Sequence, residues 1–117
     1  MWYITIRSDS TYSSQCPTVK LLELLQAMPE LMPAGPNAFQ SRTGSPSVQV
    51  VFAQCDSEGS YAVGKKSEPV FNVVELICSD GEAEWYEAIA RRIAGHLGWE
   101  VVEEHAERYI WPVGERE

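Results

Sequence analysis

The sequence has few basic residues and few side chains suited to catalysis or metal binding. It holds 9 Lys and Arg against 17 Asp and Glu, which gives a formal net charge of −8 at pH 7 with its two histidines neutral. Nucleic-acid backbones and anionic membranes would repel such a chain, so neither is an expected ligand. A chain of 117 residues is long enough to bury a real core, and we expect a single domain over residues 1–117.

Long hydrophobic runs are also absent. The longest purely apolar runs span only a few residues, which excludes a membrane-spanning helix. Residues 1–7 lack both the basic segment and the long apolar segment of a secretory signal. The composition, 44% hydrophobic and 22% charged, is ordinary for a globular protein. We therefore expect a cytoplasmic protein.

Cysteine is scarce and irregularly placed. Cys16, Cys55 and Cys78 are odd in number and widely spaced, with no C-x-x-C pair. Neither His96 nor His105 completes a zinc-binding spacing with them. The pattern predicts three reduced thiols, with Cys78 buried at a strand end, and no tightly bound metal.

Catalytic and cofactor motifs are missing as well. Gly59, Gly64 and Lys65 match the spacing of a phosphate-binding loop, but residue 66 is Lys where a Ser or Thr hydroxyl is needed. The segment that follows has a strand pattern, so no helix N-terminus is available for a phosphate. No Ser or Cys can be tied to a histidine as in a catalytic triad. The sequence therefore predicts no catalysis and no cofactor.

What the chain does contain is a clear succession of strand and helix patterns. Alternating or continuous apolar residues predict strands, and apolar residues repeating every three to four positions predict helices. The predicted strands are 2–7, 47–54, 70–78 and 99–104, and the predicted helices are 17–28 and 82–97. A short fifth strand is predicted at 108–111. The order β-α-β-β-α-β is the split βαβ pattern of the ferredoxin-like fold, an α+β two-layer sandwich with a mostly antiparallel sheet.

Each predicted helix has one apolar stripe, so both helices should pack on the same face of the sheet. The stripes consist of Leu21 and Leu25 in the first helix and Trp85, Ile89 and Ile93 in the second. Gly98 is the expected C-cap of the second helix.

Residues 29–46 contain four prolines and two glycines, which predicts a long irregular loop. The apolar side chains of Leu31, Met32 and Phe39 in this loop must be shielded from water. We expect the protein's own core, rather than a partner, to bury them. The sheet face opposite the helices also needs cover. This loop, the C-terminal segment or a second copy of the chain, which would form a homodimer, could supply it.

The acidic residues are concentrated at the C-terminal end. Residues 71–117 hold eleven acids and four bases, whereas residues 1–70 hold six acids and five bases. Such asymmetry permits a basic protein partner, which we take as the hypothesis. The candidate partner-binding residues are Glu100, Glu103, Glu104, Glu107, Tyr109 and Trp111. The alternative is that the acids only keep an edge strand soluble and that the two aromatic residues belong to the core.

Three functions fit these observations. In size and charge, though through no specific residues, the chain resembles bacterial immunity proteins, which neutralise toxins. The first hypothesis is thus an inhibitor or immunity-type protein that binds a basic protein such as a nuclease toxin. The alternatives are a small enzyme or ligand-binding module of the dimeric ferredoxin-like type, and a structural or adaptor subunit of a larger assembly.

Overall fold

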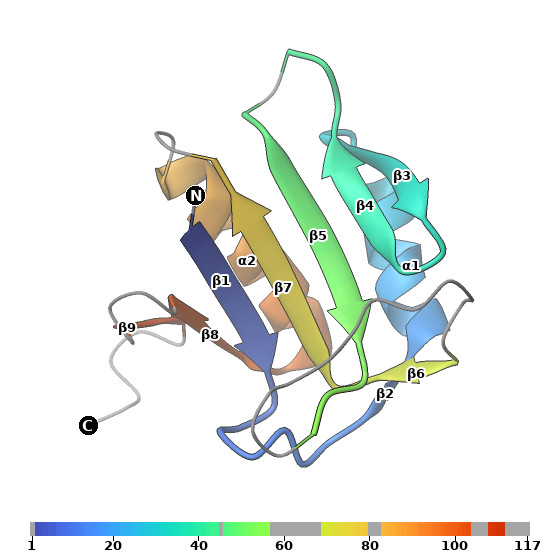
Figure 1. The fold of residues 1–117 in the computed structure, drawn as a ribbon, viewed down its shortest axis with the longest axis vertical. Helices are drawn as coiled ribbons and strands as arrows, with labels where there is room; N and C mark the ends of the chain where they lie inside the picture. Colours follow the sequence, from blue (N-terminus) through green and yellow to red (C-terminus); the bar gives the residue numbers. More distant parts are fainter. Residues whose placement is uncertain (1, 45, 57–68, 80–82, 104–107, 112–117) are drawn as a thin grey trace.

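The computed structural model describes residues 2–44, 46–56, 69–79 and 83–103, and the backbone of residues 108–111. These residues form an α+β fold with a mostly antiparallel sheet and two helices (Figure 1). The main sheet has the strand order β3-β4-β5-β7-β1-β8-β9. Its strands are β1 Trp2–Arg7, β3 Leu31–Gly35, β4 Ala38–Ser41, β5 Val48–Ala53, β7 Val73–Cys78, β8 Glu100–Glu103 and β9 Arg108–Trp111. A small second sheet pairs β2 Cys16–Pro17 with β6 Val70–Phe71.

The strands predicted from the sequence lie at the centre of the sheet. They are adjacent in the order β5-β7-β1-β8, and each neighbouring pair is antiparallel. The predicted short strand at 108–111 is confirmed as β9, which pairs with β8. The strand predicted over 70–78 is interrupted at Asn72, whose side-chain amide binds the backbone N–H and C=O of Cys55 at 2.7 and 3.0 Å. The backbone N–H of Asn72 donates to the carbonyl of Ala53 at 3.0 Å, and Asn72 itself stands between the end of β6 and the start of β7.

Helices α1 Thr18–Ala27 and α2 Ala83–Leu97 lie on the same face of the sheet, as predicted (Figure 1). One core joins them to the sheet, and it includes Leu21, Leu25, Ile89 and Ile93, with Trp85 packed against it. Pro17 and Pro29 flank α1, where a proline can start a helix but cannot continue one.

The end of α2 has the predicted glycine cap. Gly98 adopts a φ of +74°, a left-handed conformation that favours glycine, and its N–H donates to the carbonyl of Ala94 at 2.7 Å. Glu87 and Arg91, four residues apart on α2, form an ion pair at 3.5 Å.

The prediction of an irregular loop over residues 29–46 was wrong. This segment forms the hairpin of β3 and β4, which extends the sheet beyond β5. Pro33 is compatible with a strand here because β3 is the edge strand, where a missing N–H breaks no ladder bond. Leu31 and Phe39 are buried in the core, as favoured, whereas Met32 is half-buried.

Candidate functional site

The sheet face opposite the helices, called here the front face, is turned toward the viewer in Figure 1. Side chains alternate along a strand, so Ile4 and Ile6 face the helices while Tyr3, Thr5 and Arg7 belong to the front face. The cross-strand register then divides the front face into two parts. A polar cluster occupies the end near Arg7, and an exposed row occupies the opposite end.

An ion pair forms the centre of the polar cluster. The Arg7 Nε donates to Glu100 Oε2 at 2.8 Å, and the two side chains are 16% and 5% exposed. Arg7 Nη1 also lies 3.4 Å from the Tyr12 hydroxyl, and the guanidinium carbon is 5.5 Å from the centre of the Tyr12 ring. Burial alone would lower the Arg7 pKa, but the hydrogen bonds to Glu100 and Tyr12 outweigh it and raise the pKa above its usual value.

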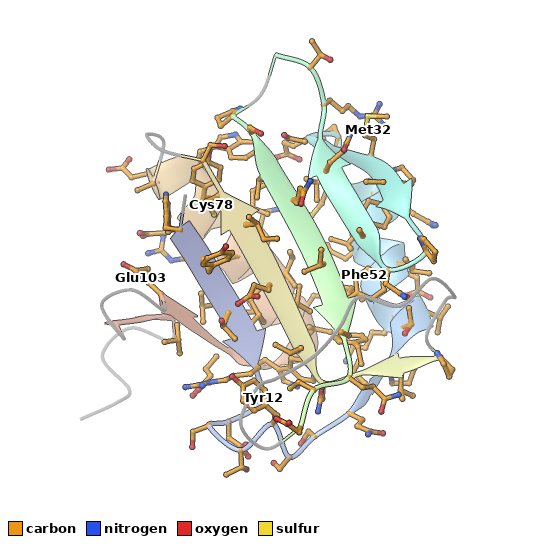
Figure 2. The ribbon with its side chains drawn as sticks, in the orientation of Figure 1. Tyr12, Met32, Phe52, Cys78 and Glu103 are labelled. Atoms are coloured by element: carbon orange, nitrogen blue, oxygen red, sulfur yellow. The ribbon has the colours of Figure 1, made fainter. Side chains whose placement is uncertain are left out.

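The loop after β1 is held against this pair. Tyr12 has a φ of 56°, uncommon for a residue with a side chain, and lies near the end of β1 (Figure 2). Its carbonyl accepts a bond from the Asn72 amide at 3.4 Å. Asp9 organises the same loop by accepting hydrogen bonds from the backbone and hydroxyl groups of both Thr11 and Ser13. These bonds, led by that from the Ser13 hydroxyl, lower the Asp9 pKa below its usual value.

A second polar contact lies beside the ion pair. The Thr5 hydroxyl donates to Glu75 Oε2 at 3.1 Å, and Thr5 is almost fully buried. Thr5 and Glu75 face one another across the β1–β7 ladder. The cluster therefore consists of carboxylates that accept hydrogen bonds from an arginine or a hydroxyl, an arrangement that orders the sheet end and the loop.

The opposite end of the front face carries the exposed row. Tyr3 pairs with Ile77, Ile77 with Gln49, and Gln49 with Gln40, so the four side chains cross β1, β7, β5 and β4 in one line. Gln40 and Gln49 are exposed, Ile77 is half-buried, and Tyr3 is 38% exposed. Ser47, Gln49, Ile77, Cys78 and Ser79 line a shallow hollow of about 140 Å³ at this end.

Of the six predicted partner-binding residues, the structure describes the side chains of Glu100 and Glu103, and these lie on opposite faces of β8. Glu100 is 4% exposed and bound to Arg7 on the front face, so it is not a solvated acid. Glu103 is half-buried and pairs with Ile4 in the register, which places it on the other face of β8. Glu104 and Glu107 lie outside the described residues. The backbone of Tyr109 and Trp111 forms part of β9, but the structure does not describe their side chains.

Among the described residues, no cysteine lies beside a histidine in a catalytic arrangement. Cys78 is fully buried at the end of β7, as predicted, and its burial raises its pKa to about 12. All three cysteines are free thiols. His96 Nε2 lies 2.9 Å from the carbonyl of Lys20 and so links α2 to α1. His105 and the segment containing Gly59, Gly64, Lys65 and Lys66 lie outside the described residues.

Two further features concern metals and membranes. In the described part of the chain, no group of three His, Cys, Asp or Glu side chains could hold a metal ion. Within the same residues, neither helix is long and apolar enough to cross a membrane.

Sequence reasoning missed the pairing of Arg7 with Glu100. The strand alternation already assigns Arg7 to the face away from Ile4 and Ile6. Finding its partner required knowing that β8 lies next to β1 and that Arg7 stands opposite Glu100 in the register. Comparison with protein-family models and with curated proteins finds no match for this chain.

Proposed function

We propose that this protein is a small acidic protein-binding domain of the inhibitor or immunity type, which neutralises a basic protein such as a nuclease toxin in the bacterial cytoplasm. The observation that carries this proposal is the charge distribution. The chain has a net charge of −8, and Arg7, Arg91 and Arg92 are each engaged by a carboxylate. Each of these ion pairs is neutral as a whole, so the excess of eight acidic residues sets the sign of the field around the protein. A field of one sign speeds association with a partner of the opposite sign.

The scaffold supports a binding role. We take the core β1-α1-β5-β7-α2-β8 as a ferredoxin-like unit, with the β3–β4 hairpin inserted and β9 added at the other side. Both helices lie behind the sheet, so the front face presents its side chains on strands rather than on loops. Side chains on a rigid sheet lose little freedom on binding, which favours affinity.

A ligand-binding module is the second candidate, because the front face has a hollow beside Gln49 and Ile77. Its volume of about 140 Å³ is below the roughly 300–1,000 Å³ of typical small-molecule pockets. An adaptor subunit would present a broad apolar patch. Among the described residues the large exposed hydrophobic side chains are Tyr3 on β1 and Val19 on α1, which are on different elements and form no such patch. Recognition of a protein therefore fits best.

The test is capture followed by inhibition. The purified chain is immobilised and exposed to lysate of its source cell at low and high salt, and each captured protein is identified and purified. We expect a basic protein, bound better at low salt, whose activity on nucleic acid or another substrate is blocked by one equivalent of the chain. If every captured protein keeps full activity with excess chain present, the proposal fails.

A further inference from the structure

We propose that the exposed row Tyr3–Ile77–Gln49–Gln40, with its hollow, receives an arginine side chain from the basic protein partner. This inference rests on the proposed function and identifies where and how the partner is held. It places a contact for the partner in the exposed row, at the opposite end of the front face from Arg7 and Glu100.

The chemistry of the hollow fits a guanidinium group. Ser47, Ser79 and Gln49 bring hydroxyl and amide oxygens that can accept hydrogen bonds, and Ile77 offers an apolar wall to the methylene groups of the arginine stem. The lining residues include neither Lys nor Arg. Tyr3, next to Ile77 in the register, adds an aromatic ring on which a cation can pack.

The hollow is built on fixed strand ends. The carbonyl of Ser47 accepts hydrogen bonds from the Tyr86 hydroxyl at 3.0 Å and from the Ser79 N–H at 3.3 Å. The carbonyl of Ser79 accepts a bond from Trp2 Nε1 at 3.2 Å, and the Trp2 and Tyr86 rings pack edge to face. Because helix and sheet hold both serines in place, an incoming side chain meets groups that are already positioned.

Electrostatics favours a cation from a protein over other occupants. A second copy of the chain carries the same charge of −8, and a nucleic acid is also anionic, so both would be repelled. Glu103, the last residue of β8, stands opposite Ile4 on the other face of the sheet, so it does not line the row and adds only to the negative charge of the molecule as a whole (Figure 2). Arginine fits better than lysine because a guanidinium is planar, weakly hydrated and able to stack on an aromatic ring.

The test uses blocked amino acids as probes. Isotope-labelled protein is titrated with N-acetyl-arginine methylamide and, as the neutral isostere, with N-acetyl-citrulline methylamide. We expect saturable NMR shifts at the Gln49 side-chain amide and the Ile77 methyl groups with arginine, and weaker binding of citrulline. Tyr3→Leu should weaken arginine binding about threefold, the loss of an exposed cation–π contact. Val19→Leu, on α1, is the control and should change nothing.

Equal binding of arginine and citrulline, or no saturable shift at Gln49 and Ile77, would overturn the inference. The experiments distinguish a failure of this arginine site from a failure of the proposed function. If a basic partner is inhibited normally by the Tyr3→Leu protein, with unchanged affinity, the function stands and the hollow is not its site. If arginine binds as expected but no basic protein is inhibited, the hollow stands and the proposed function fails.

Discussion

Among single residues, the partly buried ion pair of Arg7 and Glu100 is the most consequential feature. Removing two charges from water costs several kcal/mol per ion, so such a pair persists only with good geometry and additional hydrogen bonds. Both conditions are met, since the Nε–Oε2 distance is 2.8 Å and Arg7 also contacts Tyr12. The pair therefore fixes the loop after β1 to the end of the sheet.

Breaking this pair should destabilise the domain. Arg7→Met should lower the free energy of unfolding by about 3 kcal/mol, because it leaves the buried Glu100 carboxylate without its charge partner. Glu100→Gln should cost less, because Arg7 is only partly buried. The double variant should lose clearly less than the sum of the two. Urea melts of the four proteins measure this, and additive losses would show that the two side chains do not interact.

Asp9 should influence stability in a pH-dependent way. Its pKa is lowered from 3.8 by hydrogen bonds, first those from the hydroxyls of Ser13 and Thr11. A lowered pKa in the folded state stabilises the protein above the ordinary pKa, and this contribution disappears as pH falls through the folded-state pKa. Asp9→Asn should thus be less stable than the parent at pH 7, with the difference shrinking in acid. A difference that is the same at pH 7 and pH 2 would contradict the assignment.

The Cys78 thiol should be unreactive in the folded protein. Its burial raises its pKa to about 12, so almost no thiolate is present at pH 8, and reagents cannot reach it. Mass spectrometry after brief iodoacetamide treatment should show Cys55, which is half-buried, modified before Cys78. Rapid alkylation of Cys78 without denaturant would place that end of β7 outside the core.

At the scale of elements, the sequence predicts those segments whose pattern is local. Both helices and the strands at 2–7 and 48–53 have regular spacing of apolar residues, and their bounds agree with prediction within a residue or two. The β3–β4 hairpin could not be found this way, because Pro33 and Gly35 oppose strand formation unless the strand lies at a sheet edge. Edge position is a property of the whole sheet and is absent from the local pattern.

The candidate site was predictable only in part, for the same reason. Charge content identifies the acidic segment, but it cannot show that Glu100 is bound to Arg7 while Glu103 lies on the other face of β8. The exposed row likewise joins residues from four strands, and its existence depends on the register between them. Long-range register decides which polar residues are solvated and which are paired.

The packing of α2 on the sheet gives a direct test of the helix layer. Ile89 is 2% exposed and belongs to the core, so Ile89→Ala should cost about 2–5 kcal/mol in free energy of unfolding. Val19→Ala is the matched control, because Val19 is 63% exposed on α1 and should change stability by less than about 0.5 kcal/mol. If Ile89→Ala left the free energy of unfolding unchanged in denaturant melts, Ile89 would not be part of the core.

The molecule as a whole combines an excess of acidic charge with a sheet face that both helices leave open. Under the proposed function, charge would act over distance and set how fast a basic partner arrives, whereas the proposed arginine contact at the exposed row would set how long it stays. Exposed charges are screened over about 8 Å at physiological ionic strength, so the first effect must weaken as salt is added.

The most direct test measures the association rate with the captured basic partner at low and high salt. The rate should fall as salt rises, and replacing both Glu103 and Glu104 by Lys should lower it further without unfolding the domain. A control with the same charge change, Glu23→Lys with Glu84→Lys, alters exposed positions on the helices and should slow association less. Association rates that do not change with salt, for the parent and the Glu103/Glu104 variant alike, would contradict electrostatic recognition of a basic partner.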